Sequence, residues 1–289
     1  MRVSGRSWTP ERAAAAAATL RDRHPTRIAL ISPPRTGSTP VARLLWRHSA
    51  VAYHCHEPFE ACYWTDGEPT EPNLSRVIEV DTGVSRQAGE LPAGAGGLVL
   101  KEMSFQLDPE QFLFLAGLAT LPVLFVLRDP RLATTSRLRI VSELSGGPTF
   151  PPFESGWPSL AEQVRLCAEH GIAHVIVDAT DLRAAPGVVV PRLLDRLGLP
   201  AEPGLGNWEP RPGLELCVPE VGALMSDRRT ADDPFYRRVL GSSGVQPPDE
   251  VDWVAEEAAI RAAGLAGPVA EWLEVYAELR ASPGFLAVS

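Results

Sequence analysis

The sequence predicts an α/β protein, a three-layer sandwich in which a central parallel sheet lies between two layers of helices. The first observation behind this prediction is that short apolar runs alternate along the chain with segments of helical spacing. The second is that 45% of the 289 residues are hydrophobic, which is enough for a full core. We expect a single domain over residues 1–289, because the sequence contains neither an internal repeat nor a linker.

The first half of the chain supplies most of the predicted strands. An N-terminal helix is expected over about residues 8–23, because Thr9 suits the N-cap and Pro10 the first helical position. Residues 65–97 are rich in Pro and Gly and are predicted to form an insertion, with a helix over residues 74–80. Buried strands are expected at residues 27–32, 50–56, 97–103 and 121–127, and helices from about residue 40 and at 108–119 and 132–144.

The second half continues the alternation and ends in helices. Residues 145–158 form a predicted loop that could act as a lid, and a Pro-rich stretch begins at about residue 203. Between and after them, the expected elements are a helix at residues 159–171, a strand and turn at 173–182, a helix at 188–199 and a helical segment over about 251–281.

Net charge and cysteine content limit the partners and the compartment. The chain carries a formal net charge of −9, so it repels polyanions such as nucleic acids and sulfated polysaccharides at long range. Its four cysteines show no CxxC spacing, which indicates free thiols in a reducing compartment. No apolar run is long enough to span a bilayer, and the N-terminal alanine run lacks a cleavage site. We therefore expect a cytoplasmic protein without a nucleic-acid or membrane partner.

The stretch ISPPRTGSTPVARLL, residues 31–45, runs from a predicted strand through a turn into a helix. Such a turn presents main-chain N–H groups and the positive end of the helix dipole to an anion. Gly37 lets the main chain approach an oxyanion closely, and Arg35 supplies a cation. Hydroxyl donors are added by Thr36, Ser38 and Thr39. The pattern lacks the lysine of G-x-x-x-x-G-K-[ST], which disfavours a Walker-type ATPase. A plain tight turn with a capping hydroxyl is the alternative.

A second candidate anion site lies in LFVLRDPRLATTSRLR, residues 124–139. Arg128 stands where the predicted strand ends, and Ser136 follows eight residues later on the predicted helix. An Arg fork and a hydroxyl can hold a phosphate from one side. The alternative is a surface Arg–Asp pair beside an ordinary helical serine. Two strand–loop–helix anion sites in one sheet favour the functional interpretation.

Arg35 to Thr39, followed by Arg128 and Ser136, resemble the cytosolic and bacterial sulfotransferases that use 3′-phosphoadenosine 5′-phosphosulfate (PAPS). In that family the first loop binds the 5′-phosphosulfate and the Arg–Ser pair binds the 3′-phosphate. The segments HEPF, LKEM, VIVDATDL and NWEPRPG, in this order, are similar to a bacterial branch of sulfotransferase-like proteins. The resemblance covers roughly residues 27–245. It implies a P-loop nucleotide-binding, sulfotransferase-like fold, with PAPS as co-substrate, the bisphosphate PAP as product, and no metal.

The resemblance also implies which residues act in sulfuryl transfer. Negative charge grows on the leaving bridging oxygen, so cations must be aimed there, and Arg35 and Lys101 are the candidates. Lys101 is the single lysine among the 27 Lys and Arg residues. Many members of the family carry a Lys-x-His strand end, whereas this sequence has Met103 in place of that histidine. The expected general base is Glu57, with His56 as the second candidate.

The residues around the expected base allow other interpretations. Glu60 is a third candidate base, and Glu57 could instead be a solvated residue before Pro58. His54 and His56 would face the same side of a strand, as two zinc ligands do. No third and fourth ligand follow at suitable spacing, so we expect no metal site.

Aromatic residues and a C-terminal basic segment complete the candidates. Three aromatic side chains are expected to line a pocket or to pack in the core: Trp64, Phe105 and Trp208. In FYRRVLGSSG, residues 235–244, Arg237 and Arg238 are expected either to close over the nucleotide or to be solvated.

The sequence thus predicts a PAPS-dependent sulfotransferase that acts on a hydroxyl or amine of a small-molecule acceptor, such as a metabolite or natural product. A non-catalytic PAP- or PAPS-binding protein is the second hypothesis, because the family's histidine is replaced by Met103. A small-molecule kinase or another phosphotransferase is the third. The missing lysine of the first loop, and the pair Arg128 and Ser136, count against it.

Overall fold

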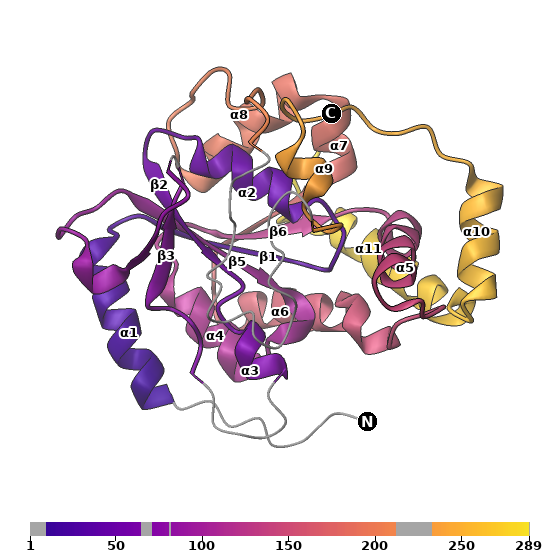
Figure 1. The fold of residues 1–289 in the computed structure, drawn as a ribbon, viewed down its shortest axis with the longest axis horizontal. Helices are drawn as coiled ribbons and strands as arrows, with labels where there is room; N and C mark the ends of the chain where they lie inside the picture. Colours follow the sequence, from indigo (N-terminus) through magenta and orange to yellow (C-terminus); the bar gives the residue numbers. More distant parts are fainter. Residues whose placement is uncertain (1–9, 65–70, 81, 212–232, 289) are drawn as a thin grey trace.

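The computed structural model describes residues 10–64, 71–80, 82–211 and 233–288, and Figure 1 shows a sheet between two layers of helices. Seven strands of this part of the chain form the sheet in the order β4-β3-β2-β5-β1-β6-β7. They are β1 (Arg27–Ser32), β2 (Val51–His56), β3 (Arg76–Glu79), β4 (Ser85–Gln87), β5 (Gly97–Met103), β6 (Val123–Leu127) and β7 (His174–Asp178). From β2 through β5, β1 and β6 to β7 all neighbours are parallel, which confirms the predicted α/β sandwich.

The helices cover both faces of the sheet. They are α1 (Pro10–Arg23), α2 (Ser38–Trp46), α3 (Glu60–Trp64), α4 (Pro109–Leu118), α5 (Pro130–Ser145), α6 (Trp157–Glu169), α7 (Ala179–Ala184), α8 (Pro186–Leu197), α9 (Arg237–Leu240), α10 (Trp253–Ala262) and α11 (Ala266–Ala281). Ile28 and Leu30 of β1 belong to the core layer with α2 and α8, whereas Ala29 and Ile31 belong to the layer with α4 and α6. Because both faces are covered, β1 is an unbroken apolar run, as parallel strands usually are.

The prediction of a helix over residues 74–80 is wrong. These residues contain β3, whose buried Val77 and Ile78 extend the sheet, and Ile78 pairs with His54 of β2. Both β3 and β4 run antiparallel to their neighbours, so the sheet is mixed at this edge rather than wholly parallel. These residues form a strand because they pair with the edge of β2. The periodicity of the segment itself does not show that such an edge lies beside it.

Several boundaries differ from the sequence-based expectation. The turn expected at the end of residues 173–182 is the short helix α7, whose N-cap Asp178 accepts a hydrogen bond from Thr180 N at 2.7 Å. The C-terminal helical segment is two helices, α10 and α11, separated at Gly264, which has a φ of 72°. The expected N-cap Thr9 lies outside the described residues. The single domain expected over residues 1–289 stays a prediction.

The described cysteines are free thiols in the core. Burial raises the pKa values of Cys62 and Cys167 to about 12, and it also raises that of Cys55. These thiols therefore stay protonated at neutral pH and pack as small apolar groups. Among the described helices, none is long and apolar enough to cross a membrane.

The sheet topology brings the candidate residues to one edge. The chain leaves β1 through α2 on one face of the sheet and enters β6 from α4 on the other face. In open α/β sheets such a change of face opens a crevice beyond the carboxyl ends of the strands. The motifs of the sequence lie there, in the loops after β1, β2, β5 and β6.

Candidate functional site

A cavity of about 260 Å³ opens at this edge of the sheet. The loop after β1, residues 34–40, forms one wall, and Arg128 and Ser136 contribute to another. The rest of the lining comes from residues that follow β2 and β5, from Ala179 and Arg183 of α7, and from several residues of segment 233–246. The two predicted anion motifs therefore line the same cavity, although 93 residues separate Arg35 from Arg128. We call it the motif cavity.

The loop after β1 has a main chain suited to holding an anion. Gly37 has a φ of 87°, and a Cβ at this position would lie 3.2 Å from the Cβ of Ala179. Arg35 also has a positive φ, of 64°. Thr36 is fully buried, and its hydroxyl donates to a main-chain carbonyl of the same loop at 2.9 Å. Because α2 begins at Ser38 without a side-chain cap, the N–H groups of its first turn are available to an anion.

The two anion motifs are in direct contact. Arg128 Nη1 donates to the main-chain oxygen of Arg35 at 3.3 Å, and Arg35 Nε donates to Ser136 Oγ at 3.2 Å. Arg35 Nη1 also donates to the main-chain oxygen of Phe235 at 3.0 Å, and its guanidinium lies 5.7 Å from the centre of the Phe235 ring. Arg35 thereby joins the loop after β1, helix α5 and the segment that begins at residue 233.

Positive charge is concentrated at this end of the motif cavity. Burial is the main cause that lowers the pKa of Arg35 to about 10, and the nearby Arg128 and Arg238 contribute to the shift. Burial also lowers the pKa of Arg128, with Arg183 and Arg238 adding to the effect. Asp249 accepts from Arg183 at 3.3 Å and from Arg238 at 2.5 Å. With its pKa at about 10, the Arg35 guanidinium remains protonated at neutral pH.

Glu57 lines the motif cavity and is held by three side chains. Lys101 Nζ donates to Glu57 Oε1 at 2.7 Å, His56 Nε2 lies 3.2 Å from the same oxygen, and Gln106 Nε2 donates to Oε2 at 3.3 Å. Glu57 has a φ of 44°, in a region that non-glycine residues seldom adopt. Lys101 is fully buried behind Glu57 and does not line the cavity. The lysine expected to face the leaving oxygen thus contacts the expected base, and both roles stay predictions.

His56 connects Glu57 with the C-terminal segment. Its Nε2 lies 2.8 Å from the hydroxyl of Tyr236, which also lines the cavity, and its Nδ1 lies 3.2 Å from His54 Nε2. Burial lowers the pKa of His54 well below its usual value, with His56 and Lys101 adding to the shift, so His54 is neutral. Within the described part of the chain, no cluster of three or more His, Cys, Asp or Glu side chains could hold a metal ion.

Glu102 is a site residue that the sequence analysis did not single out. It is fully buried, and its two carboxyl oxygens accept from the main-chain N–H groups of Phe59 and Met103, each at 2.8 Å. Burial raises the pKa of Glu102 well above its usual value, and the nearby Glu57 adds to the shift. Glu102 therefore ties the turn that carries Glu57 to the end of β5. The sequence did contain a signal for Glu102: a charged residue inside a predicted buried strand usually has a specific partner.

Some of the remaining candidate residues line the motif cavity, and others lie elsewhere. The cavity lining includes Glu60, Phe105 and Arg238. Arg237 instead is exposed and pairs with Glu143 at 3.3 Å. Trp208 is buried and lines a separate cavity, and the side chain of Trp64 lies outside the described residues.

The loop at residues 145–158 is linked to the cavity wall by one arginine. Arg137 lines the cavity and forms an ion pair with Glu154. Its guanidinium also lies 4.4 Å from the ring centre of Phe150 and 5.5 Å from that of Phe105. The action of this loop as a lid stays a prediction.

Comparison with known proteins finds a similarity in structure and no match in sequence. No family model matches the sequence, and no curated protein matches it. Among solved structures, the mouse sulfotransferase SULT7A1 complexed with PAP aligns over 91% of this chain and 93% of that chain. The two are 12% identical, and the TM-score is 0.44. A likeness of this degree assigns no function, and membership of a bacterial sulfotransferase branch stays a prediction.

Proposed function

We propose that the motif cavity binds PAPS or its product PAP, and that the protein transfers the sulfuryl group of PAPS to a hydroxyl or amine of a small acceptor. One observation carries this proposal: the two anion motifs line one cavity and touch, with 3.2 Å between Arg35 Nε and Ser136 Oγ. The resemblance of these motifs to those of sulfotransferases favours PAPS over other nucleotides.

The charges in the cavity support a ligand with two anionic groups. Four guanidinium groups lie near two carboxylates, Asp233 and Asp249, so this end carries an excess of positive charge. A buried guanidinium such as that of Arg35 gains from a charge-assisted hydrogen bond to an anion. The start of α2 offers a second position, because Ser38 and Thr39 line the cavity and the first N–H groups of a helix bind anions. A nucleotide phosphorylated on both sides of its ribose satisfies both positions.

The proposed reaction uses the groups beside the loop. The acceptor oxygen or nitrogen attacks sulfur, the bond from sulfur to the bridging oxygen breaks, and its electron pair stays on the phosphate of PAP. Arg35 and the first N–H groups of α2 stabilise this developing charge. The acceptor proton passes to Glu57, or to His56, which lies 3.2 Å from it. Lys101 acts through Glu57, by holding the carboxylate from behind.

Calorimetric titration of the full chain with PAP and with ATP tests the binding step. PAP is expected to bind saturably and more tightly than ATP. Arg128→Gln removes a charged partner of the nucleotide and should weaken PAP binding by about tenfold or more. Arg261→Gln is the matched control, because Arg261 is exposed on α10 and lines neither cavity. Tighter binding of ATP, or an unchanged PAP affinity in Arg128→Gln, would contradict the proposal.

A protein that binds PAP or PAPS without transfer is a second candidate function. Met103 favours it, because a thioether cannot take a proton at the strand end where many sulfotransferases carry histidine. Glu57→Gln separates the two candidates in an assay that follows radiolabelled PAPS across small alcohols, phenols and amines. A sulfotransferase should lose turnover by about 10²–10⁴ while keeping PAP affinity. PAP binding by the unaltered protein, with no transfer to any acceptor, would favour the binding protein.

A further inference from the structure

His56 lies beside the motif cavity but does not line it. Its side chain is 1% exposed, so an acceptor in the cavity cannot contact its ring. Tyr236 does line the cavity, and its hydroxyl lies 2.8 Å from His56 Nε2. This hydroxyl therefore gives a proton from the cavity a short route to the histidine.

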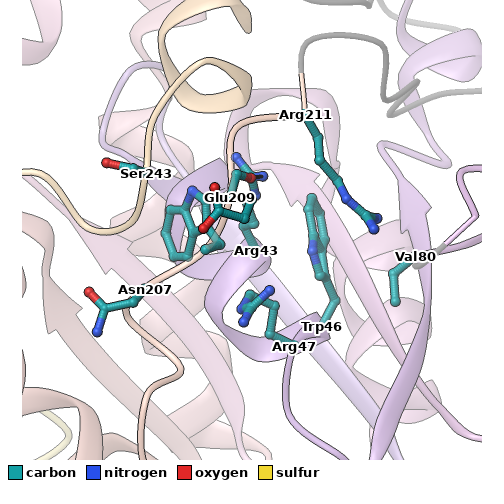
Figure 2. A pocket seen from close by; sticks show the side chains of 9 residues that line it. Arg43, Trp46, Arg47, Val80, Asn207, Glu209, Arg211 and Ser243 are labelled. Carbon is teal, nitrogen blue, oxygen red and sulfur yellow. Dashed lines mark hydrogen bonds between the residues drawn. The ribbon is translucent and has the colours of Figure 1, made fainter.

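His54 contacts the other nitrogen of the His56 ring. Its Nε2 lies 3.2 Å from His56 Nδ1, and the residue is 1% exposed. The ring of Trp46 packs against it, with 4.9 Å between the ring centres. Trp46 also lines the separate cavity of about 360 Å³ along α2, which Figure 2 shows. Packing thus fixes the His54 ring and makes its Nε2 a rigid partner for His56.

The hydrogen between the two histidines decides what His56 can do. Burial lowers the pKa of His54, so this ring is neutral and carries a single hydrogen. Val99, the register partner of His54 on β5, offers the ring a main-chain oxygen, although the contact falls outside normal hydrogen-bond geometry. This oxygen favours the hydrogen on His54 Nδ1. His54 Nε2 then accepts from His56 Nδ1, and the lone pair of His56 Nε2 faces the Tyr236 hydroxyl.

We propose that Tyr236, His56 and His54 form a proton relay for the acceptor; this inference rests on the proposed sulfuryl transfer. As the acceptor oxygen or nitrogen bonds to sulfur, its proton passes to the oxygen of Tyr236, and the original hydroxyl proton of Tyr236 passes to His56 Nε2. His56 becomes an imidazolium, and its Nδ1–H stays bound to His54. Tyr236 is then a catalytic residue and His54 a positioning residue. Glu57 Oε1, 3.2 Å from His56 Nε2, stabilises the imidazolium.

Four titratable side chains surround His56 and set how readily it takes a proton: His54, Glu57, Lys101 and Tyr236. The Glu57 carboxylate favours the imidazolium, whereas burial and the ammonium of Lys101 oppose it. His54 favours it as well, because a hydrogen bond from a charged donor is the stronger one. Without an acceptor at position 54, His56 should be a weaker base. The fall of kcat at acid pH, where His56 is already protonated, should then occur at lower pH.

NMR of the histidine ring nitrogens tests the relay without nucleotide or transfer. The chain has six histidines, so the signals of His54 and His56 can be assigned by substitution. At pH 8 in the full chain, His56 is expected to carry its hydrogen on Nδ1 and none on Nε2. His54→Phe should abolish this preference, because phenylalanine keeps a ring beside Trp46 but accepts no hydrogen bond. His54→Gln should preserve it, because the amide oxygen can accept from His56 Nδ1.

The kcat–pH profile tests the role of the relay in transfer. The assay uses radiolabelled PAPS and whichever of the small alcohols, phenols and amines gives the highest rate. His54→Phe should lower kcat by about tenfold and move its acid limb to lower pH, whereas His54→Gln should restore most of the rate. Both variants should keep the original PAP affinity. His24→Phe is the matched control, because His24 is also fully buried but binds the main-chain oxygen of Gly96 near the amino end of β5.

Three results would overturn the relay. The first is a His56 that carries a hydrogen on Nε2 at pH 8, whether or not Nδ1 is also protonated. The second is an unchanged His56 spectrum in His54→Phe. The third is a loss of kcat in His54→Gln or His24→Phe as large as in His54→Phe. If His54→Phe does not fold, the spectra of the unaltered protein and of His54→Gln still decide. Absence of PAP binding in calorimetry would instead contradict the proposed function, and the spectra do not depend on it.

Discussion

The ion pair between Lys101 and Glu57 supports the candidate site from behind, and replacing Lys101 by methionine tests its energetic role. The pair is shielded from water, since Lys101 is 0% exposed and the Glu57 side chain 6%. An exposed pair contributes about 0–1 kcal/mol, but removing one partner of a buried pair costs about 3–5 kcal/mol. Glu57 would keep His56 at 3.2 Å and Gln106 at 3.3 Å. We therefore expect a loss of about 3 kcal/mol, at the lower end of that range.

Urea denaturation at pH 7.5, followed by fluorescence and by circular dichroism, measures this loss. With an m-value of about 3 kcal/mol/M for a chain of this size, the midpoint should fall by about 1 M in Lys101→Met. The double variant Lys101→Met/Glu57→Gln should recover most of the loss, because it buries no uncompensated charge. A midpoint shift below about 0.3 M in the single variant, or strict additivity in the double variant, would refute this account of the pair.

Three further predictions concern Glu102, Gly37 and Tyr236. Because the folded-state pKa of Glu102 is raised, the folded protein holds this proton more tightly than the unfolded chain, and stability falls as pH rises towards that pKa. Glu102→Gln should therefore shrink the difference between urea midpoints at pH 5 and pH 8; an unchanged difference would contradict this. Gly37→Ala should lower stability by about 1–2 kcal/mol in urea, because φ is 87° and Ala179 lies 3.2 Å from the new Cβ. Tyr236→Phe should reduce sulfuryl transfer by about tenfold and leave PAP affinity unchanged, because it removes the hydroxyl 2.8 Å from His56; equal loss of both would indicate a structural role.

The parts of the site that depend on local geometry could be predicted from the sequence. The apolar run before Arg35 and the glycine at position 37 fix a strand and a turn within a few residues of one another. Arg128 and Ser136 likewise lie on one strand end and the helix that follows. Because the carboxyl ends of parallel strands share one edge of a sheet, two such local motifs converge once the sheet is predicted.

The partners of these residues depend on contacts that local patterns do not encode. Lys101 and Glu102 are adjacent, so strand geometry sends them to opposite faces of the sheet. Lys101 lies beside its register partner His56, and Glu102 reaches the turn after β2. Both charged residues could be read from the sequence. Their partners could not, because they come from β2 and the turn after it. Tyr236 is 180 residues from His56, and its neighbourhood contains no motif that points to the histidine.

The position of Arg35 depends on the local loop motif, and its contacts depend on the fold. The loop motif placed it next to Gly37, but only the fold brings its guanidinium to Ser136 and to the main-chain oxygen of Phe235. Both partners are neutral oxygens, whereas a phosphate oxygen would add the attraction between opposite charges to the hydrogen bond. An anion that enters beside Ser136 would therefore compete for Arg35, while a second anion occupies the start of α2. A ligand with one anionic group could satisfy either position but not both, which is why the proposed ligand carries two.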